Sequence, residues 1–241
     1  MKDIFQMTVE NNVFYAKRNV VDSIYKQARL EGIAVTFPQT NEIFEGRLVN
    51  NPHLSVDDVV AINNLKQGWR FILETLDYPV DLRYIRQINN VVGKAVIREP
   101  GALRMSEVSM GGTTWKPGLP DYDAATGNIG DIMAQDSSET ERAIDMMLYL
   151  MRAQLFYDGN KRTATLVANQ MLISKGRGIV TVPVERISEF SEHLVRYYET
   201  GDSRVVKAFL HEHCLDGTDR IRLTPSQEAA PKPPSFPRMD M

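Results

Sequence analysis

The chain has 241 residues of which 43% are hydrophobic, enough to bury one core, so we expect one globular unit with appendages. Its 28 Lys and Arg against 31 Asp and Glu give a formal net charge of −3, which provides no field to attract nucleic acid or anionic lipid. No stretch reaches the roughly 18 apolar residues that a membrane span needs. The single cysteine, Cys214, excludes an internal disulfide, and the first residues lack the apolar core of a signal peptide. These features exclude nucleic-acid and membrane binding and predict a cytoplasmic protein.

Apolar residues recur mostly at helical spacing, so the predicted fold class is all-α. The first helix is expected over 9–31, and the Phe37-Pro38 step introduces a turn followed by one short helix. Ser55, with Asp58 three residues later, is typical of the start of a longer helix. Asp81 is expected to cap the next helix, whose apolar residues also share one face.

Helical periodicity stops between 98 and 127, where glycines and prolines punctuate a stretch that is long for an ordinary connection. Within it, VSMGGTTWKPG predicts a small β-hairpin with Gly111-Gly112 at the turn. Helical spacing returns after Ser137-Ser138, continues beyond an Asp-Gly-Asn turn, and ends with the extended segment GIVTVP. Two closing helices are expected over 185–199 and 202–213. The polar, Pro-rich residues 216–241 predict a disordered tail.

The turn between the two helices of LFYDGNKRTATL carries the clearest chemistry. It places Lys161 and Arg162 in the first turn of a helix, where the helix already carries roughly half a positive charge, so an anion is expected between them. Phosphate suits this turn, because Arg162 offers a bidentate fork, Asn160 an amide, and Gly159 a close backbone approach. Asp158 is the carboxylate placed to hold Mg²⁺ together with phosphate oxygens. The alternative is an αα-hairpin whose turn is only structural.

The string from Phe156 to Ala164 resembles the Fic motif, H-x-F-x-(D/E)-G-N-(G/K)-R, in every fixed position except the first. A flap-like hairpin at 106–117 precedes it, and the resemblance extends over about 40–210. It implies a Fic (Fido) helical bundle with a small β-hairpin flap that binds ATP or a related nucleotide. Asp158 would then hold Mg²⁺, and Gly159, Asn160 and Arg162 would form the phosphate cradle.

The same resemblance implies transfer of AMP to a hydroxyl of a protein target, known as adenylylation or AMPylation. The flap would align the target by adding a strand beside it. Its expected target-facing residues are Met110, Gly111, Gly112 and Thr113.

Three residues depart from the family pattern. Gln154 stands where the family has its histidine base, and an amide cannot supply general-base catalysis worth about 10² to 10⁴ in rate. Lys161 replaces the usual glycine and resembles the Doc-like subgroup, whose members can phosphorylate a protein. Thr165 replaces a second arginine. We therefore expect a nucleotide-binding pseudoenzyme with lost or weakened AMP transfer. An active transferase of AMP or phosphate with another base, and a non-enzymatic interaction module, stay open.

Upstream, Asn41 to Gly46 is similar to the inhibitory motif (S/T)-x-x-x-E-(G/N) of the family. The resemblance implies that Glu45 obstructs ATP, for which it would have to reach Arg162, Lys161 or another cation. The alternative is that Glu45-Gly46 is a helix end. The expected division of the chain is an N-terminal helical region over 1–79, a Fic core over 80–215 and the tail over 216–241. The sequence leaves the protein partner and the oligomeric state open.

Overall fold

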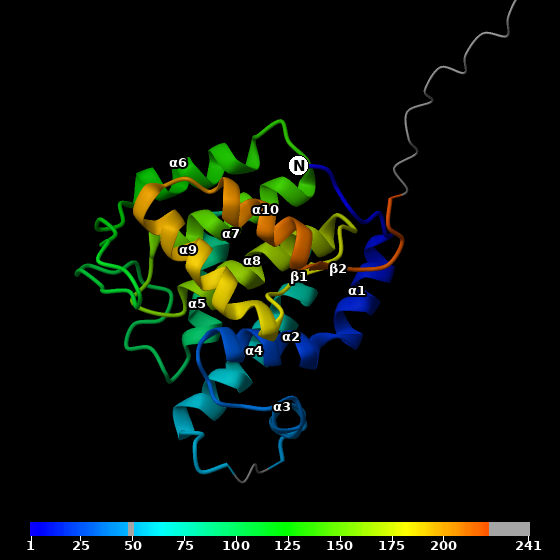
Figure 1. Cartoon of the computed structure of the whole chain (residues 1–241), viewed down its shortest axis with the longest axis vertical. Coiled ribbons are helices and arrows are strands. Elements are labelled where there is room, and N and C mark those ends of the chain that lie inside the picture. Colours follow the sequence, from blue (N-terminus) through cyan, green and yellow to red (C-terminus); the bar gives the residue numbers. More distant parts are fainter. Residues whose placement is uncertain (48–50, 222–241) are drawn as a thin grey trace, which may run out of the picture.

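The computed structural model describes residues 1–47 and 51–221 of the chain (Figure 1). Over these ranges it contains ten α-helices, one short 3-10 helix and one two-stranded sheet, so the predicted all-α class is confirmed. In the sheet, β1 (Ile179–Val180) pairs antiparallel with β2 (Leu215–Asp216). None of the helices in the described ranges has the length and apolar character to cross a membrane.

The N-terminal helices are α1 (Val9–Arg18), α2 (Val20–Leu30), α3 (Phe37–Phe44) and α4 (Val56–Glu74). The single helix expected over 9–31 is therefore two helices. Asn19 separates them, because its backbone leaves the helical region and its side chain donates to the carbonyl of Tyr15. Ser55 and Asp58 form the predicted capping box of α4.

The later helices are α5 (Leu82–Gly93), α6 (Tyr122–Met133), α7 (Glu139–Ala153), α8 (Asn160–Ser174), η1 (Val184–Arg186), α9 (Ile187–Thr200) and α10 (Arg204–His213). Asp81 caps α5 and Ser138 caps α7, as expected. The sequence did not predict α6, because Gly127 and Gly130 weaken its helical signal. Capping by Asp121 and burial of its apolar face hold α6 in place.

Helix α8 runs through the middle of the molecule (Figure 1), and all of its residues from Arg162 to Ile173 are buried. It packs against α7, α5, α4 and α1. A fully buried side chain such as Leu166 contributes about 1.5–3 kcal/mol through removal from water. The N-terminal helices share this hydrophobic core. The α7–α8 connection is thus anchored at both ends by buried helices.

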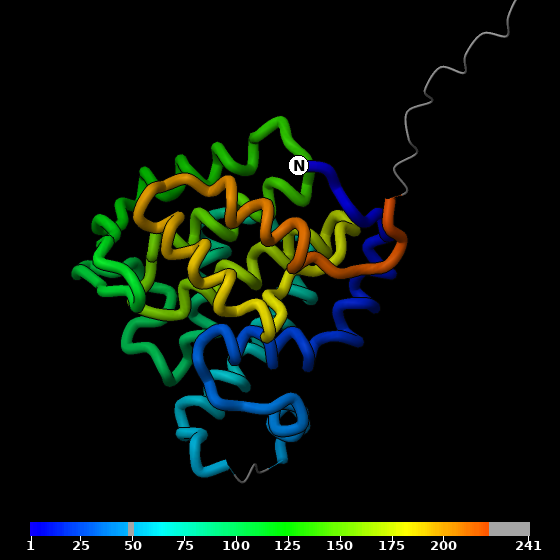
Figure 2. The backbone as a smooth tube through the Cα atoms, viewed as in Figure 1, coloured from blue at the N-terminus to red at the C-terminus, as the bar shows by residue number. Residues whose placement is uncertain are grey.

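Two predicted segments differ in the structure. Residues 106–117 form no strand, so the predicted β-hairpin is wrong, although Gly111-Gly112 does form a turn. Residues 216–221, expected in the disordered tail, pair with the N-terminal segment, where the Gln6 amide donates to Asp219 and the Ile221 amide donates to Ile4. Figure 2 shows these two segments running together. The rest of the predicted tail, 222–241, lies outside the described residues.

Candidate functional site

The loop that joins α7 to α8 is bounded by two residues in the left-handed region, Gln154 (φ 45°) and Gly159 (φ 74°). Glycine is required at 159 because a Cβ there would lie 3.2 Å from the side-chain nitrogen of Asn89 in addition to the unfavourable φ. As the N-cap of α8, Gly159 has no side chain to accept from the helix, and no side chain of residues 1–47 or 51–221 caps it. The first backbone N–H groups of α8 are therefore left for an external acceptor.

Asn160 holds the loop together from inside. Its Oδ1 accepts from the Phe156 amide at 3.0 Å, and its Nδ2 donates to the Phe156 carbonyl at 2.8 Å. The same Nδ2 donates to Oε1 of Gln154 at 3.0 Å. The amide that was predicted to contact phosphate is thus engaged within the loop, and its contribution is to fix the loop's shape.

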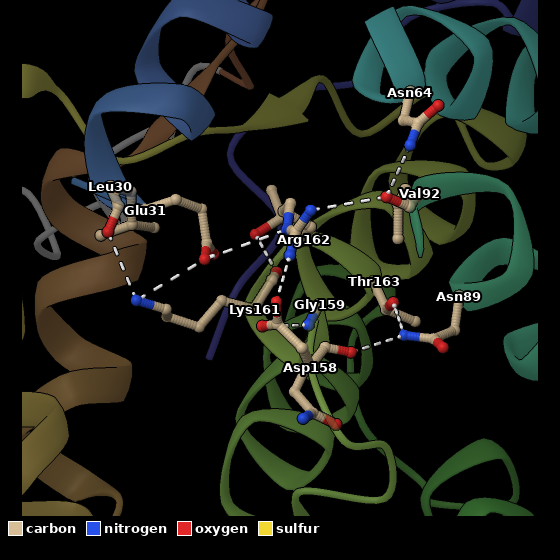
Figure 3. Close-up of polar contacts among 12 residues, drawn as sticks. Leu30, Glu31, Asn64, Asn89, Val92, Asp158, Gly159, Lys161, Arg162 and Thr163 are labelled. Carbon is tan, nitrogen blue, oxygen red and sulfur yellow. Dashed lines mark hydrogen bonds and ion pairs between the residues drawn. The ribbon is translucent and has the colours of Figure 1, made fainter. Parts of the chain in front are cut away.

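The two cations at the start of α8 face a carboxylate from α2 (Figure 3). Nε of Arg162 lies 3.9 Å from Oε2 of Glu31, and Nζ of Lys161 lies 4.0 Å from Oε1. Lys161 also donates to the Leu30 carbonyl at 3.3 Å. Glu31 is mostly buried, with 16% of its side chain exposed, so its charge is poorly screened. The cation pair predicted to bind an anion is therefore partly neutralised by the protein itself.

One side-chain nitrogen of Arg162 makes no hydrogen bond in the described structure. Its Nη2 contacts Oδ2 of Asp158 at 3.1 Å, and its Nη1 donates to the Val92 carbonyl at 3.4 Å. Its Nε is buried and has no hydrogen-bond partner among the described residues. Leaving a buried donor unpaired costs about 1–3 kcal/mol, more for a charged group, so an anionic acceptor at this point would be favoured.

Asn89 on α5 positions the backbone of the loop. It is fully buried, and its Nδ2 donates to the Asp158 carbonyl at 3.0 Å and to the Thr163 hydroxyl at 3.1 Å (Figure 3). Its Oδ1 accepts from the Gly101 amide at 2.8 Å. The sequence did not reveal this role. The sequence offered one signal for this role, namely that Asn89 is a polar residue on the inward face of α5, beside Ile88 and Val92.

The Asp158 side chain is 62% exposed, and its Oδ1 accepts from the Gly159 amide at 2.6 Å. The described residues contain no cluster of three or more acidic, His or Cys side chains that could hold a metal alone. Mg²⁺ prefers oxygen ligands and usually binds through one or two carboxylates and substrate phosphates. An exposed carboxylate beside an uncapped helix N-terminus fits that mode, with phosphate oxygens completing the coordination.

Gln154 offers no free catalytic group. Its Nε2 donates to the Met151 carbonyl at 2.6 Å, and its Oε1 accepts from Asn160. None of the four histidines forms a hydrogen bond or ion pair with this loop in the described structure. His193 and His213 pack on Phe209. Neither Gln154 nor any histidine of the described residues is therefore placed to supply the family's base.

Arg104, which is 1% exposed, ties the segment at 106–117 to the loop. Its Nε donates to the Gln154 carbonyl at 2.6 Å, and its Nη groups donate to the carbonyls of Ser106, Pro117 and Gly118. Burial lowers the pKa of Arg104, but an arginine pKa starts so far above neutrality that the side chain stays charged. Both ends of this segment are thus held beside Gln154. The sequence did not single out Arg104.

The sequence model described as "Fic/DOC family" matches residues 79–172, which include α5, α6, α7 and the loop. Residues 79–172 form a Fic/Doc family domain. The chain is 26% identical over 203 residues to "Protein adenylyltransferase Fic" of Drosophila melanogaster, covering 81% of this chain and 40% of that protein. It is 25% identical over 202 residues to the protein of the same name from Drosophila willistoni. The chain thus spans about two-fifths of the length of these curated relatives.

Solved structures support the same fold. "Fic-1 (aa134 - 508) from C. elegans" aligns with a TM-score of 0.69 and 23% identity, covering 82% of this chain and 61% of that one. A Fic domain containing signaling protein from Bacteroides thetaiotaomicron aligns with a TM-score of 0.65 and 20% identity, covering 78% and 75%. These similarities show the Fic fold of the chain.

The glutamate that faces the Fic/Doc loop is not the one predicted. Glu45 lies at the end of α3, where it pairs with Arg47 at 2.6 Å and accepts from Asn41 at 3.3 Å. Glu31, which precedes Gly32 in a second Glu-Gly dipeptide, contacts the loop instead. The spacing from Glu31 back to Gln27 matches the inhibitory motif, but glutamine replaces its Ser or Thr. Only the packing of α2 distinguishes the two dipeptides.

The predicted flap residues and Thr165 also have definite places in the Fic/Doc domain. Gly111 and Gly112 form the exposed turn of the 106–117 segment between half-buried Met110 and Thr113, and the Thr113 hydroxyl donates to Glu199 at 3.0 Å. The Thr165 hydroxyl donates back to the Lys161 carbonyl at 2.9 Å. No second arginine therefore stands on this face of α8.

Proposed function

We propose that the Fic/Doc domain binds ATP, or a related nucleotide, at the loop 154–162 with Mg²⁺, and that its transfer of AMP to a protein hydroxyl is weak or lost. The observation that carries the proposal is the uncapped N-terminus of α8, flanked by Lys161 and by Arg162, whose Nε faces Glu31 without a hydrogen-bond partner in the described structure. The curated relatives are named protein adenylyltransferases. Because this chain spans only part of their length, their activity supports the proposal by analogy.

Binding of the phosphates follows from the loop's own chemistry. The backbone N–H groups at the start of α8 and the positive end of its dipole favour an anion. Lys161 adds a charge, and Arg162 adds a charged donor whose Nε lacks an acceptor. Mg²⁺, when bound, would neutralise phosphate charge, with Asp158 as its ligand from the protein.

Weak transfer follows from Gln154. In AMP transfer the target oxygen forms a bond to the α-phosphorus, the bond from that phosphorus to the bridging oxygen breaks, and pyrophosphate leaves. The hydroxyl proton needs an acceptor. The amide of Gln154 cannot take it, and both ends of this amide are already engaged. Loss of a general base costs about 10² to 10⁴ in rate, whereas binding does not require one.

Glu31 is proposed as the internal competitor of the nucleotide. Its carboxylate lies about as far from Lys161 as from Arg162 and is mostly buried. An incoming phosphate would meet this like charge and would have to compete for the same two cations. The role that the resemblance implied for Glu45 is therefore assigned to Glu31.

Isothermal titration of ATP with and without Mg²⁺ tests the binding. Wild type should bind ATP more tightly with Mg²⁺ than without it. The control Asp131→Asn, which neutralises an exposed carboxylate of α6, should behave in the same way. Asp158→Asn should lose about tenfold in affinity with Mg²⁺, equivalent to about 1.4 kcal/mol, and less without it. Absence of ATP binding to wild type, or a Mg²⁺ effect that survives in Asp158→Asn, would contradict the proposal.

Incubation with cell lysate and ATP labelled at either the α or the γ phosphate tests the chemistry. We expect little transfer of either label. Strong α-label transfer would identify an active adenylyltransferase, and strong γ-label transfer would identify a kinase. Absence of both transfer and ATP binding would indicate a non-enzymatic interaction module.

A further inference from the structure

Helix α5 and the residues that follow it carry a local excess of positive charge in a chain whose net charge is −3. Between Asp81 and Glu99 the sequence contains four cationic residues and no acidic one. They are Arg83, Arg86, Lys94 and Arg98. This local charge belongs to neither the loop nor the flap, and the proposed function makes no use of it.

Two of these cations line a surface pocket of about 330 Å³. Helix α5 contributes Arg83, Arg86, Gln87 and Asn90 to it, and the turn at 100–102 forms the other wall. Within the part of the chain that the structure describes, no acidic side chain lines the pocket. Among the described residues, neither arginine has a carboxylate partner within ion-pair distance. The lining therefore combines two guanidinium groups and two amides on α5 with the turn of Pro100, Gly101 and Ala102.

The pocket is fixed in shape by the backbone of the turn. Nε of Arg86 donates to the Gly101 carbonyl at 2.8 Å, which leaves both Nη groups without a hydrogen-bond partner in the described structure. Gly101 has φ 77°, and a Cβ there would lie 2.7 Å from the Arg86 carbonyl oxygen, so the turn packs directly on α5. One arginine of the pocket is thus held in place before any ligand arrives.

Arg83 and Arg86 are three residues apart and share one face of α5, so their like charges repel. An anion between them removes that repulsion. A phosphate group suits the pocket, because its several oxygens can accept from two guanidinium forks and from the amides of Gln87 and Asn90 at once. We propose that this pocket binds a small phosphate-bearing anion at a site separate from the 158–162 loop.

The pocket is connected to the loop through a single buried side chain. Gly101, which accepts from Arg86, donates its amide to Oδ1 of Asn89 at 2.8 Å. Asn89 in turn donates to the Asp158 carbonyl and the Thr163 hydroxyl. An anion that draws Arg86 away from Gly101 therefore perturbs a residue that positions the loop. Binding in the pocket does not depend on the proposed nucleotide function, although this connection would allow it to influence that function.

Titration with inorganic pyrophosphate in low-salt buffer without Mg²⁺ tests the site. Followed by NMR of ¹⁵N-labelled protein, it should shift the resonances of Asn90 and Gly101 first. Arg83→Gln with Arg86→Gln should weaken this binding about a hundredfold, because the anion loses charge-assisted hydrogen bonds from both guanidinium groups. Lys94→Gln with Arg98→Gln removes the same charge from the same segment outside the pocket and should stay within about threefold of wild type.

Several outcomes would overturn the proposal. One is the absence of shifts at Asn90 and Gly101, and another is equal weakening by the two double variants, which would indicate a diffuse field. Equal affinity for citrate would overturn the assignment to phosphate. Lys161→Gln separates the two sites, because it should weaken shifts at Gly159 while leaving those at Gly101 unchanged. If the nucleotide proposal is wrong, ATP should not shift the resonance of Gly159, whereas pyrophosphate should still shift those of Asn90 and Gly101.

Discussion

Replacing Glu31 by glutamine should increase the affinity for Mg²⁺-ATP. The carboxylate lies 3.9 Å from Arg162 and 4.0 Å from Lys161. At such distances a charge pair is worth about 1 kcal/mol in water and about 4 kcal/mol at an effective dielectric constant of 20. Lys161 is 34% exposed, so solvent reduces its share. We expect a net gain of about 1–2 kcal/mol, which corresponds to a roughly 5- to 30-fold lower Kd.

Isothermal titration of wild type, Glu31→Gln and Glu45→Gln measures this gain. Glu45→Gln is the matched control, because it removes the same charge from a glutamate that pairs with Arg47 outside the loop. Thermal melts followed by circular dichroism should show that Glu31→Gln remains folded. A carboxylate at the C-terminal end of α2 is unfavourable to the helix dipole, so its loss should not weaken the helix.

The expected gain would be contradicted by an unchanged or weaker ATP affinity in folded Glu31→Gln. It would also be refuted by an equal gain in Glu45→Gln. The first result would show that Glu31 does not compete with phosphate. The second would restore the role that the inhibitory motif implied for Glu45.

Three further predictions concern the loop and its supports. Gln154→His combined with Glu31→Gln should raise transfer of α-label from ATP about a hundredfold over wild type, and no gain would show that the base is not the missing element. Arg104→Met should lower the free energy of unfolding, measured in urea, by at least about 3 kcal/mol, because it leaves several carbonyls without their donor. A loss under about 1 kcal/mol would contradict the role of Arg104 in holding the 106–117 segment to the loop. Asn89→Ala should lower the free energy of unfolding by about 2–3 kcal/mol. The control Asn63→Ala loses one partly buried hydrogen bond and should lower it by less than about 1 kcal/mol. Equal losses would be inconsistent with Asn89 as a support of the loop.

Features that depend on a few neighbouring residues could be predicted from the sequence. Ser55, Asp81 and Ser138 cap their helices as their local patterns indicated. The Asp-Gly-Asn turn and the helix that starts after it follow from the positive φ that glycine accepts at 159. Capping and turn chemistry act over three or four residues, so spacing alone reveals them.

Features that depend on tertiary packing could not be predicted in this way. Two Glu-Gly dipeptides were available, and only the packing of α2 brings Glu31 rather than Glu45 to the loop. The predicted hairpin at 106–117 does not form, and the carbonyls at both ends of the segment accept from buried Arg104, a distant contact that the local pattern does not contain. Asn89 acts across α5, the 99–102 turn and the loop, which no sequence period connects.

A crystal structure of the wild-type protein with ATP and Mg²⁺ tests the central claim most directly. We expect triphosphate density against the backbone N–H groups at the start of α8, with a phosphate oxygen within hydrogen-bond distance of Nε of Arg162 and Mg²⁺ at Asp158. Gln154 should make no contact that could remove a proton from an acceptor hydroxyl. An empty loop with Glu31 still beside Arg162 at saturating ATP, or nucleotide bound elsewhere on the chain, would contradict it.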